Sequence, residues 1–300
     1  MDSKVKVEFN PWYKVGKDMR RLELMSYLES VNEICAVENE NIPSFCIVIN
    51  GRVVGLVDPS DGWASASTSH GGYMVQHIRE LNPPVIFKYQ WRRGSDYPSG
   101  TISAGYPCAT QIPCPANLLT RTRPIAVTAR MRVNRDYHWG VDEQWMIARS
   151  RIVEQAELLE REGYNSKWGF VTADQYIYEL WDAQIGFDWC GAGFLTYRLI
   201  EYIRAGVVPI TRPLGEDWPV REDVILEDGI HCVFCSDPGQ FASEAKLLLA
   251  DRVKIEKIRR NLIELWQEKL CPIAQGNWIW EKLKAALVLR QDKSVDNYCG

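Results

Sequence analysis

Arg198 and Glu201, three residues apart, follow a glycine turn made by Gly191 and Gly193. Residues at this spacing share one face of a helix. A helix that begins just after such glycines offers unpaired backbone N–H groups and the positive end of its dipole, which together favour a phosphate. A guanidinium suits a pyrophosphate, and a carboxylate suits a pair of ribose hydroxyls. The spacing therefore indicates a nucleotide-binding site, for which the alternative is an ordinary surface ion pair.

The segment 183–213 supplies the elements that would position these side chains. A short apolar run precedes the glycine turn, an amphipathic pattern predicts a helix over about 195–205, and a second apolar run covers 207–210. Gly206 stands just past the last helical turn, where a left-handed residue commonly ends a helix. The change of period from 2 to 3.6 therefore predicts a strand, turn, helix, strand unit.

The run RLIEYIRAGVVPI resembles the C-terminal, nucleotide-sugar half of GT-B glycosyltransferases, and most of all that of exostosin-like enzymes. In that family an Arg-x-x-Glu helix leads into a strand of the pattern small-Gly-x-x-Pro-x. The residues that carry the match here are Arg198, Leu199, Glu201, Ala205, Gly206, Val207, Val208, Pro209 and Ile210. The resemblance implies an α/β fold of two Rossmann-like domains that face each other across a cleft, with C-terminal helices crossing back. We expect an acceptor-side domain over 1–122, a nucleotide-sugar-binding domain over 123–272, and a helix over 273–300 that packs back on the first domain.

The resemblance also implies further residues on the donor side. Arg130 and Arg132, at the end of the run PIAVTARMRVN, would face the donor phosphates, and Asp217, beyond the second strand, would contact the sugar. A surface pair of arginines is the alternative for the first two. The donor-binding candidates are therefore Arg130, Arg132, Gly191, Gly193, Thr196, Arg198, Glu201 and Asp217.

Two carboxylates follow a predicted strand in the first part of the chain. The runs FCIVI and VVGLV flank an Asn-Gly pair, which predicts a hairpin, and the second run leads into Asp58 and Asp61. Because α/β folds place their chemistry at the carboxyl ends of strands, either carboxylate could take a proton from an acceptor hydroxyl. A simple turn is the alternative. Trp63, together with Lys88 and Arg92 at the end of PPVIFKYQWRR, completes the acceptor-side candidates.

Other segments have clear patterns of their own. A helix is predicted over about 142–162, with a buried stripe of Ile147, Ile152, Ala156 and Leu159. The stretch 94–124 has no period and is expected to be irregular. The tail 240–290 predicts two or three amphipathic helices broken before Pro272, because proline lacks the N–H that a helix interior needs.

Length and composition restrict the class of protein. The chain has 300 residues, of which 46% are hydrophobic and 25% charged, and this suits two soluble α/β domains. A net charge of −4 argues against broad binding to nucleic acid, although a local cluster could serve a phosphorylated donor or a polyanionic acceptor, or form a solvated face. Its members are Arg121, Arg123, Arg130, Arg132 and Arg135.

Cysteine usage and the absence of an apolar leader favour the cytoplasm. The 9 cysteines form no regular framework, so reduced thiols are expected. The start of the sequence has no signal-peptide core, and no apolar run approaches the ~20 residues of a membrane helix. Cys232 and Cys235 form a C-x-x-C pair inside the run HCVFC, where buried strand cysteines are favoured over a zinc or redox site.

The resemblance to GT-B enzymes, together with these residues, implies a glycosyltransferase. The expected reaction moves a sugar from a nucleotide-diphospho-sugar to a hydroxyl acceptor, either a glycan or a modified base in DNA. Arginines would stabilise the leaving diphosphate, so no metal and no cofactor is expected, and the sequence has no Asp-x-Asp metal motif. One alternative is an NAD(P)-dependent oxidoreductase, although the G-x-G lacks a third glycine and Asp188 and Trp189 stand where an apolar strand is expected. A non-catalytic nucleotide-sugar-binding module is the other.

Overall fold

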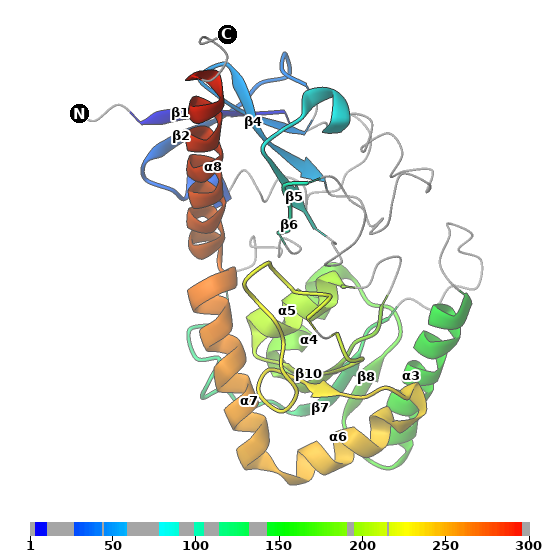
Figure 1. Cartoon of the computed structure of the whole chain (residues 1–300). Helices are drawn as coiled ribbons and strands as arrows, with labels where there is room; N and C mark the ends of the chain where they lie inside the picture. Colours follow the sequence, from blue (N-terminus) through cyan, green and yellow to red (C-terminus); the bar gives the residue numbers. More distant parts are fainter. Residues whose placement is uncertain are drawn as a thin grey trace. The chain divides into compact units, whose positions relative to one another are not determined.

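The computed structural model describes residues 4–10, 27–43, 45–58, 78–89, 99–104, 114–131, 143–190, 195–214 and 216–295. The chain divides into two compact units (Figure 1). The first unit contains Met1–Pro107, Pro219–Val224 and Lys269–Gly300, and the second contains Cys108–Trp218 and Ile225–Glu268. The sequence prediction set the first boundary at 122 and did not place the short segment 219–224 with the first unit.

The second unit contains a parallel sheet in which the strands lie in the order β11-β10-β9-β7-β8. Its strands are β7 (Ile125–Ala129), β8 (Ser166–Trp168), β9 (Ala183–Phe187), β10 (Val208–Thr211) and β11 (Val233–Phe234). From β7 the chain passes through α3 (Glu143–Arg161) to β8 on one side, and through α4 (Ala173–Asp182) to β9 on the other. The strand order therefore reverses between β7 and β9, which makes their carboxyl ends the switch point where α/β folds bind ligands.

Helices cover both faces of this sheet (Figure 1). Consecutive residues of a strand point to opposite faces. Gly186 packs against Tyr202 of α5 (Tyr197–Ala205), whereas the ring of Phe187 lies 5.2 Å from that of Phe241 in α6 (Phe241–Ala250). Helix α3 packs with α6, and α5 packs with α4 and with α7 (Arg252–Leu265). One layer therefore consists of α3 and α6, and the other of α4, α5 and α7.

The first unit is built on a mixed sheet with the strand order β2-β1-β3-β4-β5-β6. The strands are β1 (Val5–Phe9), β2 (Ile34–Glu38), β3 (Cys46–Ile49), β4 (Arg52–Asp58), β5 (Val85–Lys88) and β6 (Thr101–Ser103). Strands β3 and β4 form the predicted hairpin, and Asn50 and Gly51 have φ of 52° and 73°, as a type I′ turn requires. Pairs β4–β5 and β5–β6 are parallel.

The last helix, α8 (Pro272–Val295), packs on β4 and β5 within the first unit (Figure 1). It begins at Pro272, after a π-helical turn over Trp266–Leu270, so the predicted break lies where the sequence put it. A Cβ at Gly276 would lie 2.0 Å from the backbone oxygen of Tyr27, so only glycine permits this approach. Among the described residues, no helix combines the length and apolar character that crossing a bilayer requires.

Two predicted details were wrong. Ile152, Ala156 and Leu159 of α3 are fully buried, but Ile147 is 49% exposed, because five residues of helix rotate the side chain by about 140° from Ile152. The stretch 94–124, expected to be irregular, contains β6, which extends the sheet by parallel pairing with β5.

Candidate functional site

Polar and cationic side chains gather where β9 ends and α5 begins, beside the switch point. We call Arg149, Asp188, Thr196, Arg198 and Arg212 the β9-end cluster. They come from α3, from the residue after β9, from the cap and first turn of α5, and from the residue after β10. The residues that follow β9 and β10, and the start of α5, lie at one edge of the parallel sheet, because the carboxyl ends of parallel strands lie together.

The N-terminus of α5 is fixed by a side-chain cap. The Thr196 hydroxyl accepts a hydrogen bond from the backbone N–H of Leu199 at 3.1 Å and donates one to Asp188 Oδ1 at 2.7 Å. At the other end Gly206 has φ of 62°, and a Cβ there would lie 2.9 Å from Ile263 Cδ1. The helix therefore begins and ends as the sequence predicts, and its start is tied to the end of β9.

Asp188 holds Arg198 as well as Thr196. Nη1 of Arg198 donates to Asp188 Oδ1 at 3.1 Å, and its Nε donates to the backbone oxygen of Arg130 at 3.2 Å. Asp188 is 2% exposed. Burial raises its pKa, although the charge of Arg198 and the Thr196 hydrogen bond act in the opposite direction. A buried carboxylate of this kind costs free energy unless it is paired, so Arg198 and Asp188 depend on each other.

Arg149 and Arg212 approach the same chain end from other elements. Arg149 Nε donates to the backbone oxygen of Cys190 at 2.8 Å, and burial, followed by the charge of Arg198, lowers the pKa of Arg149 to about 10. Arg212 donates to the Cys190 sulfur at 3.3 Å, and its guanidinium lies 6.0 Å from the ring centroid of Trp189. The effect of the Arg198 charge on the pKa of Arg149 indicates that these two cations lie close together.

Two buried polar atoms at this edge lack a hydrogen-bond partner among the described residues: the Trp189 indole N–H and the Thr211 hydroxyl. Trp189 follows β9, and Thr211 is the last residue of β10. Buried polar groups in proteins are almost always satisfied by protein, water or ligand. Both atoms therefore add to the polar character of the edge.

Tyr202 joins α5 to the strands on which the helix packs. It is fully buried, and its hydroxyl donates to the backbone oxygens of Phe187 and Thr128 at 3.1 and 3.3 Å. A Cβ at Gly186 would lie 2.4 Å from Cε2 of the Tyr202 ring. Burial raises the Tyr202 pKa, so the hydroxyl remains protonated and available as a donor. The glycine in β9 thus sets how closely α5 approaches the sheet.

The other donor-side candidates differ in their surroundings. The Arg130 guanidinium is bound by Glu179 and by the backbone oxygen of Trp168. Glu201 is half-buried and lies close to Tyr176, whose pKa is raised by burial first and by the charge of Glu201 second. Asp217 is exposed. Gly191, Gly193 and Arg132 lie outside the described residues.

In the first unit, Asp58 and Lys88 end adjacent parallel strands and pair in register. Lys88 Nζ lies 2.9 Å from Asp58 Oδ2, and both side chains are 0% exposed. The two residues are thus brought together as an interior ion pair. The remaining acceptor-side candidates, Asp61, Trp63 and Arg92, lie outside the described residues, and the assignments of this group stay predictions.

The arginine cluster does not form one solvated face in the described part of the chain. Arg121 pairs with Asp182 at 2.7 Å. Arg123 is 6% exposed and donates to four backbone oxygens, those of Leu118, Leu180, Ala183 and Ala205. The last three lie at the ends of α4 and α5, where a cation stabilises exposed carbonyl groups. The guanidinium groups of Arg121, Arg123 and Arg130 thus all bind protein groups of the second unit.

The C-x-x-C pair is buried at β11. Cys232 is 0% exposed and Cys235 is 5% exposed. Burial raises the pKa of both thiols, and each sulfur donates to a backbone oxygen, that of Glu227 or of Asp237. No group of three potential metal-ligating side chains occurs among the described residues. The two thiols are thus buried beside a strand, which is the arrangement that the sequence favours over a zinc or redox site.

Sequence reasoning missed three members of the cluster: Arg149, Asp188 and Arg212. Arg149 stands three residues before Ile152, on the buried stripe of α3, and a cation at an apolar position of a helix is a usable signal. Asp188 stands where the sequence predicts an apolar strand, but β9 ends at Phe187, so the residue lies just beyond it. Arg212 follows an apolar run in the same way.

Comparison with known proteins identifies the fold. No protein-family model matches the chain, and no curated protein matches it. Among solved structures, HepE from Anabaena, in complex with UDP and glucose, matches with a TM-score of 0.50 and 13% identity over 77% of this chain and 71% of HepE. TarM from S. aureus, in complex with fondaparinux, alpha-GlcNAc-glycerol and UDP, matches with a TM-score of 0.47 and 9% identity over 84% of this chain and 52% of TarM.

The pneumococcal O-GlcNAc transferase GtfA, in complex with UDP and GlcNAc, matches with a TM-score of 0.38 and 11% identity over 84% of this chain and 53% of GtfA. The chain thus spans about half the length of TarM and of GtfA. The likeness to HepE shows an α/β fold of the GT-B type, so the predicted fold class is confirmed. The likeness is one of fold, because the identity is low.

Proposed function

We propose that this protein is a glycosyltransferase that binds a nucleotide-diphospho-sugar at the β9-end cluster. The observation that carries the proposal is the convergence of Arg149, Arg198 and Arg212 on the end of β9. Among the described residues of the cluster, Asp188 is the one acidic group. The excess of positive charge, beside a helix N-terminus at a switch point, suits a diphosphate. The shared fold with HepE, a protein solved with UDP and glucose, is consistent with such a ligand.

In the proposed reaction the acceptor oxygen attacks the anomeric carbon, and the bond from that carbon to the β-phosphate oxygen breaks. Negative charge grows on the diphosphate as it leaves. Arg198 and Arg149 are already held in place by Asp188 and by the Cys190 backbone, so they stabilise that charge without reorganising. The transfer then proceeds without a metal or cofactor, and added chelator leaves the rate unchanged.

The remaining residues take roles in binding the nucleotide and in accepting the proton of the acceptor hydroxyl. Glu201 holds the nucleotide ribose, and the indole N–H of Trp189 and the hydroxyl of Thr211 are donors for polar atoms of the nucleotide. The proton of the acceptor hydroxyl passes to a carboxylate of the first unit, Asp61 or Asp58. The acceptor is a glycan, with a modified base in DNA as the alternative, and the closer family is that of the exostosin-like enzymes.

One observation favours a second candidate, a nucleotide-sugar-binding module without catalysis. Asp58 is fully buried and paired with Lys88, and such a carboxylate takes a proton from a substrate only if the pair opens. If Asp61 does not serve in its place, the chain binds its donor without transferring the sugar.

A ligand screen tests the proposal. UDP, other nucleoside diphosphates, their sugar conjugates and NAD(P) are titrated by thermal shift, since a bound ligand raises the melting temperature. Products are followed by mass spectrometry of the released nucleotide. Arg149→Met should weaken UDP binding by about 10- to 100-fold, as expected for a lost hydrogen bond to a charged group. Arg151→Met, an exposed position on the same helix, is the matched control and should leave binding unchanged. A shift with NAD(P) and none with any nucleoside diphosphate would contradict the proposal.

A further inference from the structure

The side chain of Arg130 makes an anchor between three elements of the second unit. Its Nε and Nη2 donate to the two carboxylate oxygens of Glu179 in α4, each at 2.8 Å, and its Nη1 donates to the backbone oxygen of Trp168 at the end of β8. The side chains of Arg130 and Glu179 are 12% and 21% exposed. A two-point Arg–carboxylate pair with little exposure is among the strongest ion pairs in proteins.

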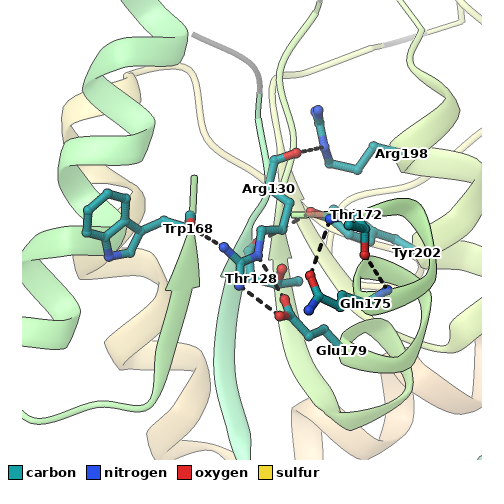
Figure 2. A network of polar contacts seen from close by, with 8 residues as sticks. All are labelled: Thr128, Arg130, Trp168, Thr172, Gln175, Glu179, Arg198 and Tyr202. Atoms are coloured by element: carbon teal, nitrogen blue, oxygen red, sulfur yellow. Dashed lines mark hydrogen bonds and ion pairs between the residues drawn. The ribbon is translucent and has the colours of Figure 1, made fainter. Parts of the chain in front are cut away.

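The backbone of Arg130 makes a different contact. Its carbonyl oxygen accepts from Nε of Arg198 at 3.2 Å. Figure 2 shows the Arg130 guanidinium lying with Glu179 and Trp168, whereas Arg198 meets Arg130 at its carbonyl. The contacts with Glu179 and Arg198 therefore lie at opposite ends of the same residue.

The chain turns at Arg130, so the direction of this carbonyl is not set by the sheet. The recorded pairing of β7 with its neighbours ends at Ala129, and the N–H of Met131 donates back to the Ala129 oxygen at 2.8 Å. A hydrogen bond between residues two apart marks a tight turn centred on Arg130. The Met131 N–H belongs to the same planar peptide unit as the Arg130 carbonyl, so outside the ladder this hydrogen bond and the side-chain anchor together hold the carbonyl in one orientation.

We propose that Glu179 and Arg130 are positioning residues that act together as a strut, and that the strut orients the Arg198 guanidinium toward the bound diphosphate. This inference rests on the proposed function, and it gives Arg130 a role other than direct contact with the donor phosphates. Asp188 holds Arg198 through Nη1, and the strut holds it through Nε. Together with the covalent bond from Cδ to Nε, these two hydrogen bonds fix the plane of the guanidinium, whereas one hydrogen bond leaves it free to rotate.

The direction in which Glu179→Gln changes UDP affinity distinguishes the two possible roles of Arg130. If Arg130 bound the diphosphate directly, Glu179 would compete for it, and Glu179→Gln would tighten UDP binding. In the strut, Glu179→Gln loosens the anchor and should weaken UDP binding by about three- to tenfold, the usual size of coupling between residues in one network. Asp182→Asn is the matched control, because Asp182 lies in the same helix and pairs with Arg121.

The experiment is calorimetric titration of UDP and of inorganic pyrophosphate into the wild-type protein and four variants: Glu179→Gln, Asp182→Asn, Arg198→Met and Glu179→Gln/Arg198→Met. We expect weaker binding in Glu179→Gln, unchanged binding in Asp182→Asn, and no further loss when Glu179→Gln is added to Arg198→Met, because the strut acts only through Arg198. Tighter or unchanged binding in Glu179→Gln, or an additive loss in the double variant, would overturn the strut.

A second readout keeps the strut separate from the proposed function. If the wild-type protein binds neither UDP nor pyrophosphate, the proposed function fails, but the strut can still be measured without ligand. The fall in melting temperature of the double variant should then be smaller than the sum of the two single falls, since both substitutions break one network. Strictly additive falls would mean that Glu179 and Arg198 are not connected through Arg130.

Discussion

Gly186→Ala tests how α5 packs on the sheet of the second unit. The added Cβ would lie 2.4, 2.5 and 2.7 Å from three carbons of the Tyr202 ring, whereas carbon atoms in contact normally lie about 3.5–4.0 Å apart. The ring must therefore move by about 1 Å or more. Tyr202 is fully buried in a close-packed interior, so the ring can move only by displacing its neighbours.

The cost has two parts. Overpacking a buried site costs about 1–3 kcal/mol, and moving the ring strains or breaks the hydrogen bonds of its hydroxyl to Phe187 and Thr128, each worth about 0.5–1.5 kcal/mol. A total of about 2–4 kcal/mol corresponds to a fall of about 5–15 °C in the melting temperature of a domain of this size. Because Tyr202 lies one turn after Arg198 in α5, UDP binding should weaken as well.

Differential scanning calorimetry of Gly186→Ala is the measurement, with Gly239→Ala as control. The nearest atom to a Cβ at Gly239 is Asp237 Oδ1 at 3.3 Å, a side chain that can adjust. The double variant Gly186→Ala/Tyr202→Leu should be no less stable than Tyr202→Leu alone, because leucine lacks the ring atoms that clash. A melting temperature for Gly186→Ala equal to that of the wild type would refute this account of the packing.

Three further predictions concern buried charges. Lys88→Met removes the ammonium group that lies 2.9 Å from the buried Asp58 carboxylate and should cost about 3–5 kcal/mol in urea unfolding. Lys88→Met/Asp58→Leu should recover most of this loss, and an equal loss in both variants would contradict a buried pair. Arg123→Met removes the donors to four backbone oxygens and should cost about 3–5 kcal/mol, and a loss below ~1 kcal/mol would mean that water replaces them. The pKa of Asp188 is raised in the folded protein, which means that the folded state binds this proton more tightly than the unfolded state does. The carboxyl group therefore contributes stability below its unfolded pKa of about 3.9. That contribution is lost as pH rises through the folded pKa. The stability of the wild type relative to Asp188→Asn should therefore fall as pH rises above about 4, and a constant or rising difference in pH-dependent unfolding would show that the proton is not linked to folding.

Local patterns predicted the central unit of the second domain well. The glycine at position 206 predicted where α5 ends, and the Asn-Gly pair predicted the hairpin of the first unit, because both depend on backbone conformations that few residues adopt. The strand, helix, strand order over 183–211 follows from hydrophobic period alone, since each element there buries one regular face.

Contacts between distant segments could not be predicted in the same way. Arg130 was assigned to phosphate by resemblance, but its actual partner Glu179 is 49 residues away, and nothing in the local pattern of either residue points to the other. Segment 219–224 is separated in sequence from the rest of the first unit, yet the N–H of Glu222 donates to the oxygen of Ser103. Such pairings depend on the order of strands in the sheet, which the hydrophobic period does not encode.

The most direct test of the central claim is a crystal structure of the protein with UDP. The account predicts that the diphosphate lies at the start of α5, with phosphate oxygens within hydrogen-bond distance of the guanidinium of Arg198 and of that of Arg149. A diphosphate bound elsewhere, or one at α5 that contacts neither arginine, would contradict it.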